Sequence, residues 1–545
     1  MVVMIERKAR TEWLLSAVLL ALALLVRLVP GERMVDDAYI TFRYARNLIE
    51  GHGFVYNPGE RVLGTTTPLY TLLMAGLALT SGSRDFPSLA LAVNALAGAA
   101  SVGLLYGLGR RVAGHWAPAT AAALLWAAAP YSVTFAVGGM ETDLTIALLL
   151  AASYAHVTGH SRAMAIFSAL ALLARPDTAI LLGLLWLDLV LARFFGGVYP
   201  ERSRGAQGKL RVPWQEGLIT LALLAPWLIF GTLYFGSPLT ISVAAKSITY
   251  RLPPGAALVR LIQHYSTPFF EDAFLGSYWR LIGFAVYLLL CGLGGLRVVR
   301  RDRRAWPLLA YPYAYLIVFA VANPLLFRWY LSPPLPFYFL FIVAGIWALI
   351  SDVEKLVIQP PTSNFQLPTS NLQYPISNLR HPVSSSLFAL LTIAAFICTL
   401  NAWALHPDHG PDRPAPEMAW FKLELLYAQA ADAVRSQAAP GDTLCAGDIG
   451  VLGYRTGLRI LDTVGLVTPE STRHYPADPA IYVINYAIPA DLVLALDPDY
   501  IVILEVYGRR GLLPDPRFQA HYQLLGNLGT DIYGANGMLI FERRP

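Results

Sequence analysis

Apolar segments of membrane-crossing length alternate with short polar loops through the first 405 residues. A helix needs roughly 20 mostly apolar residues to cross the hydrocarbon core of a bilayer, and most of these segments approach that length. The pattern therefore predicts a polytopic α-helical membrane protein with about eleven spans. The predicted spans are 13–29, 87–109, 116–136, 144–156, 163–174, 179–192, 218–235, 281–296, 306–322, 333–350 and 387–405.

One further apolar segment, Leu69–Thr80, is short for a span, and we interpret it as a re-entrant or juxtamembrane helix. With that assignment the clusters of basic residues all fall on one side, which the positive-inside rule identifies as the cytoplasm. The C-terminal part then lies outside. Arg7, Lys8 and Arg10 precede the first span with no small-residue cleavage site after it, which is typical of a retained signal-anchor. The inside clusters are Arg110–Arg111, the loop with Arg193, Arg202, Arg204, Lys209 and Arg211, and the five arginines of 297–304.

The composition changes after His406, where short β-type runs separated by glycine and proline replace the long apolar segments. Pro416–Gln437 has helical spacing. We therefore predict a transmembrane domain over 1–405 and an extracytoplasmic α/β domain over 406–545. The glycine-rich stretch Gly447–Tyr454 lacks phosphate-loop spacing, and turn formation is its better interpretation. The predicted strands are Asp442–Ala446, Arg459–Asp462, Tyr500–Leu504 and Met538–Phe541.

A low-complexity insert over 359–385 separates the last two predicted spans. Proline recurs every seven residues between polar residues, and this spacing forbids a helix. We expect a flexible cytoplasmic loop.

Composition agrees with the membrane class: 56% of the 545 residues are hydrophobic, 14% are charged, and the mean hydropathy is +0.49. The net charge of +5 comes from cations in short loops, a membrane-orientation pattern that excludes a nucleic-acid partner. Three cysteines, two of them in apolar segments, exclude a disulfide framework.

The first outer loop, residues 30–68, carries the densest set of polar side chains beside a membrane segment. It begins with the adjacent acids Asp36 and Asp37, and charge at a membrane surface without a task is normally avoided. The loops predicted on the same side add further acids, cations and a tyrosine. Together the candidate residues are Arg43, Tyr44, Tyr56 and Asn57 in the loop, and Glu141, Arg175, Asp177, Lys246, Arg328 and Tyr330 elsewhere.

The loop sequence DDAYITFRYARNLIEGHGFVYNPGERVLGTTTPL resembles the first outer loop of GT-C glycosyltransferases, in particular the bacterial arabinofuranosyltransferase-like branch. Shorter similarities are Gly139–Thr142, Arg175–Asp177, Tyr234–Leu239 with Lys246 following, and Gly447–Pro469. The chain departs from the pattern at Leu63, where an acidic residue is common, and at Thr240-Ile241, where Pro-Asn is usual.

The resemblance implies an inverting hexosyl- or pentosyltransferase of the cell membrane, which moves a sugar from a polyprenyl-phosphate donor to an acceptor hydroxyl on a cell-envelope glycan, glycolipid or protein. By resemblance Asp36 is the base, and Asp37 is expected to cap the following helix. Lys246, Arg328 and Arg175 are predicted to bind the donor phosphate. The substrate-binding candidates are Arg43, Tyr44, Tyr56, Asn57, Glu141, Asp177 and Tyr330. Neither a cofactor nor a protein-only metal site is expected, although a divalent cation stays an open alternative.

Two other interpretations remain open. The acids could be helix caps and the cations could reach to the membrane interface as ordinary snorkelling side chains. A transporter or flippase of lipid-linked sugars would also present acids and cations to the outside, although such carriers usually contain internal repeats, and we find none in the sequence.

Overall fold

The computed structural model describes residues 2–194, 212–358, 382–404, 415–416 and 419–545. Arg202, Arg204, Lys209, Arg211 and most of the 359–385 insert lie outside the described residues. The interpretation of the insert as a flexible loop therefore stays a prediction.

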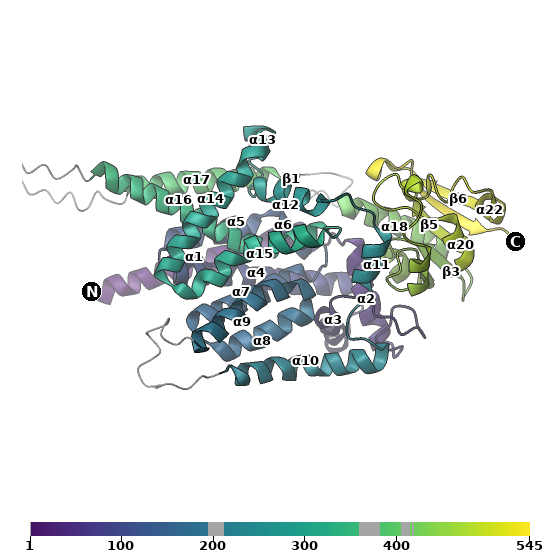
Figure 1. Cartoon of the computed structure of the whole chain (residues 1–545), viewed down its shortest axis with the longest axis horizontal. Coiled ribbons are helices and arrows are strands. Elements are labelled where there is room, and N and C mark those ends of the chain that lie inside the picture. Colours follow the sequence, from purple (N-terminus) through teal and green to yellow (C-terminus); the bar gives the residue numbers. More distant parts are fainter. Residues whose placement is uncertain (1, 195–211, 359–381, 405–414, 417–418) are drawn as a thin grey trace, which may run out of the picture.

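Two parts are visible in Figure 1: a bundle of long helices, and a sheet-containing domain at one end of it that ends at the C-terminus. Each predicted span coincides with a helix, or in one case with two. These helices are α1 (Val2–Leu28), α4 (Phe86–Ala113), α5 (Trp116–Ala128) with α6 (Pro130–Val137), α7 (Thr142–Thr158), α8 (Ser161–Ala174), α9 (Ala179–Phe194), α10 (Trp214–Phe235), α14 (Trp279–Arg301), α15 (Trp306–Ala322), α16 (Leu335–Ile358) and α17 (Pro382–Asn401).

Six of the described helices are long and apolar enough to cross a membrane: α4, α10, α14, α15, α16 and α17. The pair α5 and α6, bent by 44° at Ala129 and Pro130, adds a seventh if it forms one span. Proline at the start of α6 explains the bend, because it cannot donate the hydrogen bond that would continue α5. The protein is thus a multi-pass helical membrane protein, whereas the expected count of about eleven spans is not confirmed.

Glycine residues allow two helices of the bundle to pack closely. The long helices α14 and α16 cross where Gly294 and Gly345 meet, and a Cβ on either glycine would overlap a backbone oxygen of the opposite helix. Without a hydrophobic driving force between helices in lipid, such close backbone approach is what holds them together.

Loops predicted to share a side of the membrane lie together at one end of the bundle. At the end with the basic clusters, Arg111 pairs with Asp302 at 3.1 Å. At the other end Val35 donates its N–H to Gly138 at 3.0 Å, and Tyr70 donates to the carbonyl of Gly139 at 3.1 Å. These contacts agree with the predicted placement of the loops at two opposite ends of the bundle. Which end faces the cytoplasm stays a prediction.

The end of the bundle opposite the basic clusters contains short helices that do not belong to the bundle. Helix α2 (Asp36–Ile49) begins the first outer loop, and the segment interpreted as non-spanning forms α3 (Pro68–Ser81), which has only 14 residues. The long loop between α10 and α14 contains α11 (Ser242–Thr249), α12 (Ala256–Ser266) and α13 (Asp272–Leu275). Of these elements, α2 and α11 contact the C-terminal domain.

The C-terminal domain is α/β, as predicted. After two-residue strands β1 (Trp403–Ala404) and β2 (Ala415–Pro416), helix α18 (Ala419–Arg435) leads into a five-stranded sheet of order β4-β3-β5-β7-β6. β3 is parallel to β4 and β5, and the pairs β5–β7 and β6–β7 are antiparallel. The strands are β3 (Thr443–Ala446), β4 (Arg459–Asp462), β5 (Tyr500–Leu504), β6 (Tyr522–Leu528) and β7 (Met538–Arg543).

Four of these five strands were predicted from their apolar runs, and β6 was missed. Most of its residues are exposed or half-buried, because it is an edge strand with a register shift between Leu524 and Gly526. An exposed edge strand has no reason to be apolar on either face, so the periodicity that identifies buried strands is absent.

The remaining short helices of the C-terminal domain are α19 (Gly450–Thr456), α20 (Ala490–Leu496), α21 (Glu505–Gly508) and α22 (Pro516–His521).

Labelling of single cysteines will test the membrane orientation. Glu50→Cys and Asp491→Cys lie exposed at the Asp36 end, and Arg300→Cys and Lys355→Cys lie exposed at the basic end. Because cation-rich loops are retained in the cytoplasm, a membrane-impermeant maleimide should label only the first two variants in intact cells, and all four after permeabilisation. Labelling of Arg300→Cys in intact cells would contradict the predicted orientation.

Candidate active site

The first outer loop and the C-terminal domain are joined through the carboxylate of Asp36. Its two oxygens accept hydrogen bonds from the backbone N–H groups of Gly450 at 2.9 Å and Val451 at 2.7 Å, which begin α19. A negative group at a helix N-terminus is favoured by the helix dipole and by its unpaired amides. Residue 450 must be glycine for this approach, since a Cβ there would overlap the carbonyl oxygen of Asp36.

Three of the four predicted substrate-binding residues of the loop take part in the same contact. Arg43 donates to the carbonyl of Leu458 at 2.7 Å, and the Tyr56 hydroxyl donates to the carbonyl of Ile449 at 2.5 Å. Asn57 bonds both backbone groups of Ile460, accepting at 3.0 Å and donating at 2.9 Å. All three side chains are buried. The C-terminal domain is therefore bound along the length of the loop.

The fourth residue, Tyr44, forms hydrogen bonds within the loop. Its hydroxyl donates to the carbonyl of Val62 at 2.7 Å and accepts from the N–H of Gly64 at 2.9 Å. The contacts of Arg43, Tyr44, Tyr56 and Asn57 give all four a structural task. Their substrate-binding role stays a prediction.

The expectation that Asp37 caps α2 is wrong. The N-cap is Val35, which has an extended backbone, and Asp36 and Asp37 are already the first two helical residues. The chain reaches α2 in a fixed extended conformation because Arg33 and Val35 bond the backbone of Val137 and Gly138. The aspartates are therefore directed away from the start of their own helix, Asp36 toward α19 and the half-buried Asp37 toward a cavity.

A cavity of about 370 Å³ lies between the Asp36 end of the bundle and the C-terminal domain. Its size is within the range of about 300–1,000 Å³ typical of small-molecule sites. Both parts of the protein contribute. It is lined by Val35–Asp37, Tyr250, Leu252, Ala256, Ala257, Arg260, Pro324–Phe327 and Trp329 of the membrane part, and by Leu423, Tyr427, Asp448, Ile484–Tyr486, Tyr507 and Tyr533 of the C-terminal domain.

Three carboxyl groups border this cavity: Asp36, Asp37 and Asp448. The Tyr427 hydroxyl donates to Asp448 at 2.5 Å. Burial raises the pKa of Asp448 to about 6, and the charge of Asp37 acts in the same direction. Burial, with the charge of Asp448, also raises the pKa of Asp36 well above its usual range. Burial disfavours the charged form of both Asp36 and Asp448, and each added negative charge in the cavity acts in the same direction.

Positive charge lies on the membrane side of the cavity. Arg260 lines it, and partial burial together with the neighbouring charge of Arg328 lowers the pKa of Arg260. The ammonium of Lys246 lies 4.6 Å from the ring centre of Phe327, a cavity residue. Within the described part of the chain, no carboxylate forms an ion pair with Arg260 or Lys246. Two cations thus remain available to an anionic ligand.

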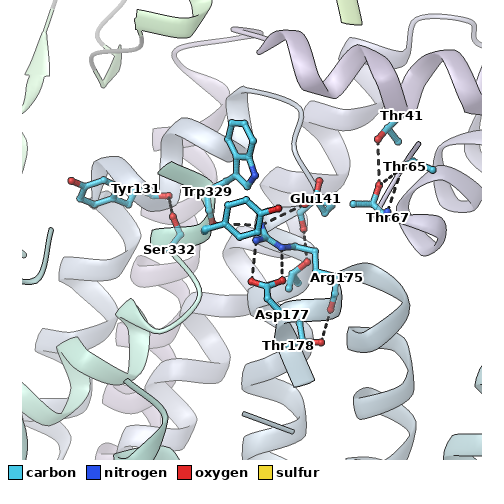
Figure 2. Close-up of polar contacts among 12 residues, drawn as sticks. Thr41, Thr65, Thr67, Tyr131, Glu141, Arg175, Asp177, Thr178, Trp329 and Ser332 are labelled. Carbon is cyan, nitrogen blue, oxygen red and sulfur yellow. Dashed lines mark hydrogen bonds and ion pairs between the residues drawn. The ribbon is translucent and has the colours of Figure 1, made fainter. Parts of the chain in front are cut away.

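Arg175 has a different environment. Figure 2 shows its guanidinium between Asp177 and Glu141: Nε lies 2.9 Å from Asp177 Oδ1, and the closest approach to Glu141 is 3.5 Å. The guanidinium also lies 4.7 Å from the ring centre of Tyr330 and donates to the carbonyl of Trp329 at 3.4 Å. The four predicted site residues therefore form one cluster, in which Arg175 and Glu141 are buried, Asp177 and Tyr330 are half-buried, and two acids already balance the cation. Their donor- and substrate-binding roles stay predictions.

Sequence reasoning did not select Asp448, Tyr427 or Arg260. Asp448 stands inside the glycine-rich stretch that was interpreted as a turn, two residues after a predicted strand, and an acid in that position is a usable signal. Arg260 had no such signal, since one arginine in an amphipathic loop helix is ordinarily a solvated side chain.

The described residues contain no group of three or more histidine, cysteine or acidic side chains that could hold a metal ion. Participation of a divalent cation stays an open alternative without a ligand set.

A larger cavity of about 810 Å³ lies at the opposite end of α4, among the ends of α14, α16 and α17. Its lining comes from the bundle and includes Arg297, Arg301 and Lys355, with no residue of the first outer loop or of the C-terminal domain. The smaller cavity, which brings the acids together, is therefore the candidate active site.

Comparison with known proteins gives the class. The structure superposes on the oligosaccharyltransferase AglB of Archaeoglobus fulgidus, with a TM-score of 0.55 and 12% identity over 95% of this chain and 73% of that one. It also superposes on ArnT of Cupriavidus metallidurans in the apo state, with a TM-score of 0.57 and 13% identity over 98% of each chain. These proteins are GT-C glycosyltransferases, and the chain has their fold.

Similarity in sequence covers a smaller part of the chain. A stretch of 163 residues is 34% identical to the terminal β-(1→2)-arabinofuranosyltransferase of Mycobacterium tuberculosis, which covers 28% of this chain and 24% of that relative. The chain thus matches only about a quarter of the relative's length. Residues 418–541 match a domain of unknown function, DUF8728, which corresponds to the C-terminal α/β domain from α18 to β7.

Substitution of Gly450 will test the contact between the first outer loop and the C-terminal domain. Gly450→Ala places a methyl group against the backbone of Asp36, and overpacking of this kind costs about 1–3 kcal/mol. We expect a lower unfolding temperature in detergent and faster proteolytic release of the C-terminal domain. The control is Gly529→Ala, where no atom lies within 4 Å of the added methyl. Identical behaviour of the two variants would contradict a tight contact at α19.

Proposed function

We propose that the protein transfers a sugar from a polyprenyl-phosphate donor to an acceptor hydroxyl at the outer face of the cell membrane. One observation carries the proposal: a single cavity at the bundle end is lined both by the adjacent acids Asp36 and Asp37 and by Arg260, a cation without an ion-pair partner in the described chain. Transfer from a phosphate needs both, a base for the acceptor and positive charge for the leaving group.

In this mechanism the acceptor oxygen forms a bond to the anomeric carbon as the bond from that carbon to the phosphate oxygen breaks. The electron pair of the broken bond leaves with the phosphate, and the acceptor proton passes to a carboxylate. A single in-line displacement inverts the anomeric centre, which makes the enzyme an inverting glycosyltransferase. Whether the sugar is a pentose or a hexose depends on its fit in the cavity.

Asp37 is the better base of the pair. Both oxygens of Asp36 already accept backbone hydrogen bonds from α19, and a base must present a lone pair to the acceptor hydroxyl. Asp37 lies one residue further along α2, is half-buried and lines the cavity. This assignment exchanges the roles that the sequence suggested for the two acids.

Arg260, with Lys246 and Arg328, would hold the donor phosphate. Guanidinium and ammonium groups form strong charge-assisted hydrogen bonds to phosphate, and they stabilise the negative charge that develops as the sugar leaves. The membrane wall of the cavity also offers apolar side chains, Leu252, Leu325 and Leu326, to the first isoprene units. Lipid-linked donors are consistent with the fold, since AglB was solved with a dolichol-phosphate and ArnT with undecaprenyl phosphate.

The assay is direct. Full-length protein in lipid nanodiscs is incubated with a panel of polyprenyl-phosphate pentoses and hexoses and with candidate acceptors, and donor loss and product are followed by mass spectrometry. Movement of intact lipid-linked sugar across proteoliposomes without donor loss would contradict transfer and favour a flippase.

Asparagine substitutions will separate the two acids. Asp37→Asn keeps the shape but removes basicity, so we expect turnover to fall by about 10² to 10⁴-fold with little change in unfolding temperature. Asp36→Asn should retain more turnover but lose stability, because one amide of α19 is left without an acceptor at a cost of about 1–3 kcal/mol. Full turnover by Asp37→Asn together with an inactive, well-folded Asp36→Asn would reverse the assignment.

Arg260→Gln will test the phosphate site. Loss of a charge-assisted hydrogen bond costs about 1.5–3 kcal/mol, so we expect the donor KM to rise by about 10-fold or more, with the acceptor KM unchanged. The matched control is Arg280→Gln in the same outer region, because Arg280 pairs with Asp272 and does not line the cavity. Equal donor KM values for the two variants would exclude Arg260 from the phosphate site.

A further inference from the structure

The C-terminal sheet presents a ligand crevice to the candidate active site. β3 lies between β4 and β5, and all three strands are parallel. At the carboxyl end of such a central strand the connections diverge to opposite sides, and α/β proteins commonly bind ligands in the crevice formed there. Here the segment that leaves β3 contains Asp448, and Asp448 lines the cavity that also contains Asp37.

Asp448 is held in a defined orientation. The Tyr427 hydroxyl on α18 donates to one of its oxygens, Oδ2, at 2.5 Å, while the residue remains only half-buried. The neighbouring amides of Gly450 and Val451 are occupied by Asp36, so they do not compete for the ligand. Asp448 can therefore accept a hydrogen bond from a ligand in the cavity.

Aromatic side chains supply the other part of the lining. Tyr486 packs against Tyr250 and Tyr507, with ring centres 5.5 Å and 5.0 Å apart. On the membrane side, the rings of Phe327 and Trp329 stack at 4.6 Å. Such rings are apolar on their faces, whereas the hydroxyls of tyrosine and the amide of Asn485, another lining residue, are polar.

We infer that the crevice of the C-terminal domain binds the acceptor, and that the acceptor is a sugar. The inference rests on the proposed function and extends it. Adjacent hydroxyls of a sugar ring are hydrogen-bond donors at a fixed spacing. One hydroxyl can donate to the carboxylate of Asp37 and the next to the carboxylate of Asp448. The C–H faces of the ring pack on the aromatic side chains. A serine or threonine of a peptide offers a single hydroxyl and no such apolar face.

Asp448 thus fixes the acceptor while Asp37 takes its proton. Asp448 lies on the wall that the C-terminal domain contributes, and Arg260 lies on the wall that the membrane part contributes. A change at Asp448 therefore acts on acceptor binding more than on donor binding, which it reaches only through the charge of Lys246. This division distinguishes a binding role from a purely structural one.

Binding is measured on the full-length protein in nanodiscs by saturation-transfer NMR. The probes are methyl disaccharides of arabinofuranose, mannose and glucose, and a hexapeptide that contains serine and threonine. We expect at least one disaccharide to bind the wild type, and Asp448→Asn to weaken it by about 10- to 100-fold, the loss of a hydrogen bond to a charged group. Tyr427→Phe keeps the carboxylate but frees its orientation, and should weaken binding less.

The control variant is Asp491→Asn, since Asp491 lies exposed on α20 of the same domain and pairs with Arg517 away from the cavity. Unfolding temperatures establish that each variant is folded. In the transfer assay, Asp448→Asn should raise the acceptor KM by the same factor and change the donor KM far less.

Three results would overturn the inference: no disaccharide binds the wild type, only the peptide binds, or folded Asp448→Asn binds as tightly as Asp491→Asn. Donor consumption together with any of these would leave the proposed transfer intact. Sugar binding that depends on Asp448, without consumption of any donor, would instead support the acceptor site and contradict the transferase.

Discussion

The bond between the Asp36 carboxylate and the first amides of α19 is the constraint on which the site depends. It joins residues 414 and 415 positions apart and places the C-terminal domain on the first outer loop. Each hydrogen bond to a charged group is worth about 1.5–3 kcal/mol, against the cost of burying the carboxylate. Together with the hydrogen bonds of Arg43, Tyr56 and Asn57 to the same domain, this contact places Asp448 and Tyr427 at the cavity that Asp37 lines.

A second principle, the pairing of buried charge, distinguishes structural groups from available ones. Arg175 is balanced by Asp177 and Glu141, and Arg27 of α1 is bound to Asp143 at 2.9 Å. Charges removed from water must be paired in this way, because an isolated buried ion is very costly. Lys246 and Arg260 have no such ion pair within the described chain, and they lie at or near the cavity. Arg260 is exposed and Lys246 is half-buried, so water can solvate both cations until an anionic ligand replaces it.

The sequence determined the class of the molecule and most of its elements. Apolar length identified the helices of the bundle and the short α3, and buried β-type runs identified β3, β4, β5 and β7, because burial imposes a local composition that needs no knowledge of partners. The first outer loop was likewise conspicuous from its own residues, since polar groups beside a membrane segment are costly unless they have a task. Edge strand β6 was not predicted, because an exposed edge does not require an apolar composition.

Tertiary structure alone decided what each polar residue does. The resemblance suggested Asp36 as the base and Asp37 as a helix cap, but α19, more than 400 residues later, binds both oxygens of Asp36. The carboxylate of Asp37, which also lines the cavity, is not bound by α19. Arg43, Tyr56 and Asn57 had the composition of a binding site but bond the C-terminal domain, and Arg175 is paired internally. Asp448 and Arg260 became candidates only when distant segments met. The physical reason is that burial leaves a local pattern along the chain, whereas hydrogen bonds and charge pairs depend on partners that folding supplies.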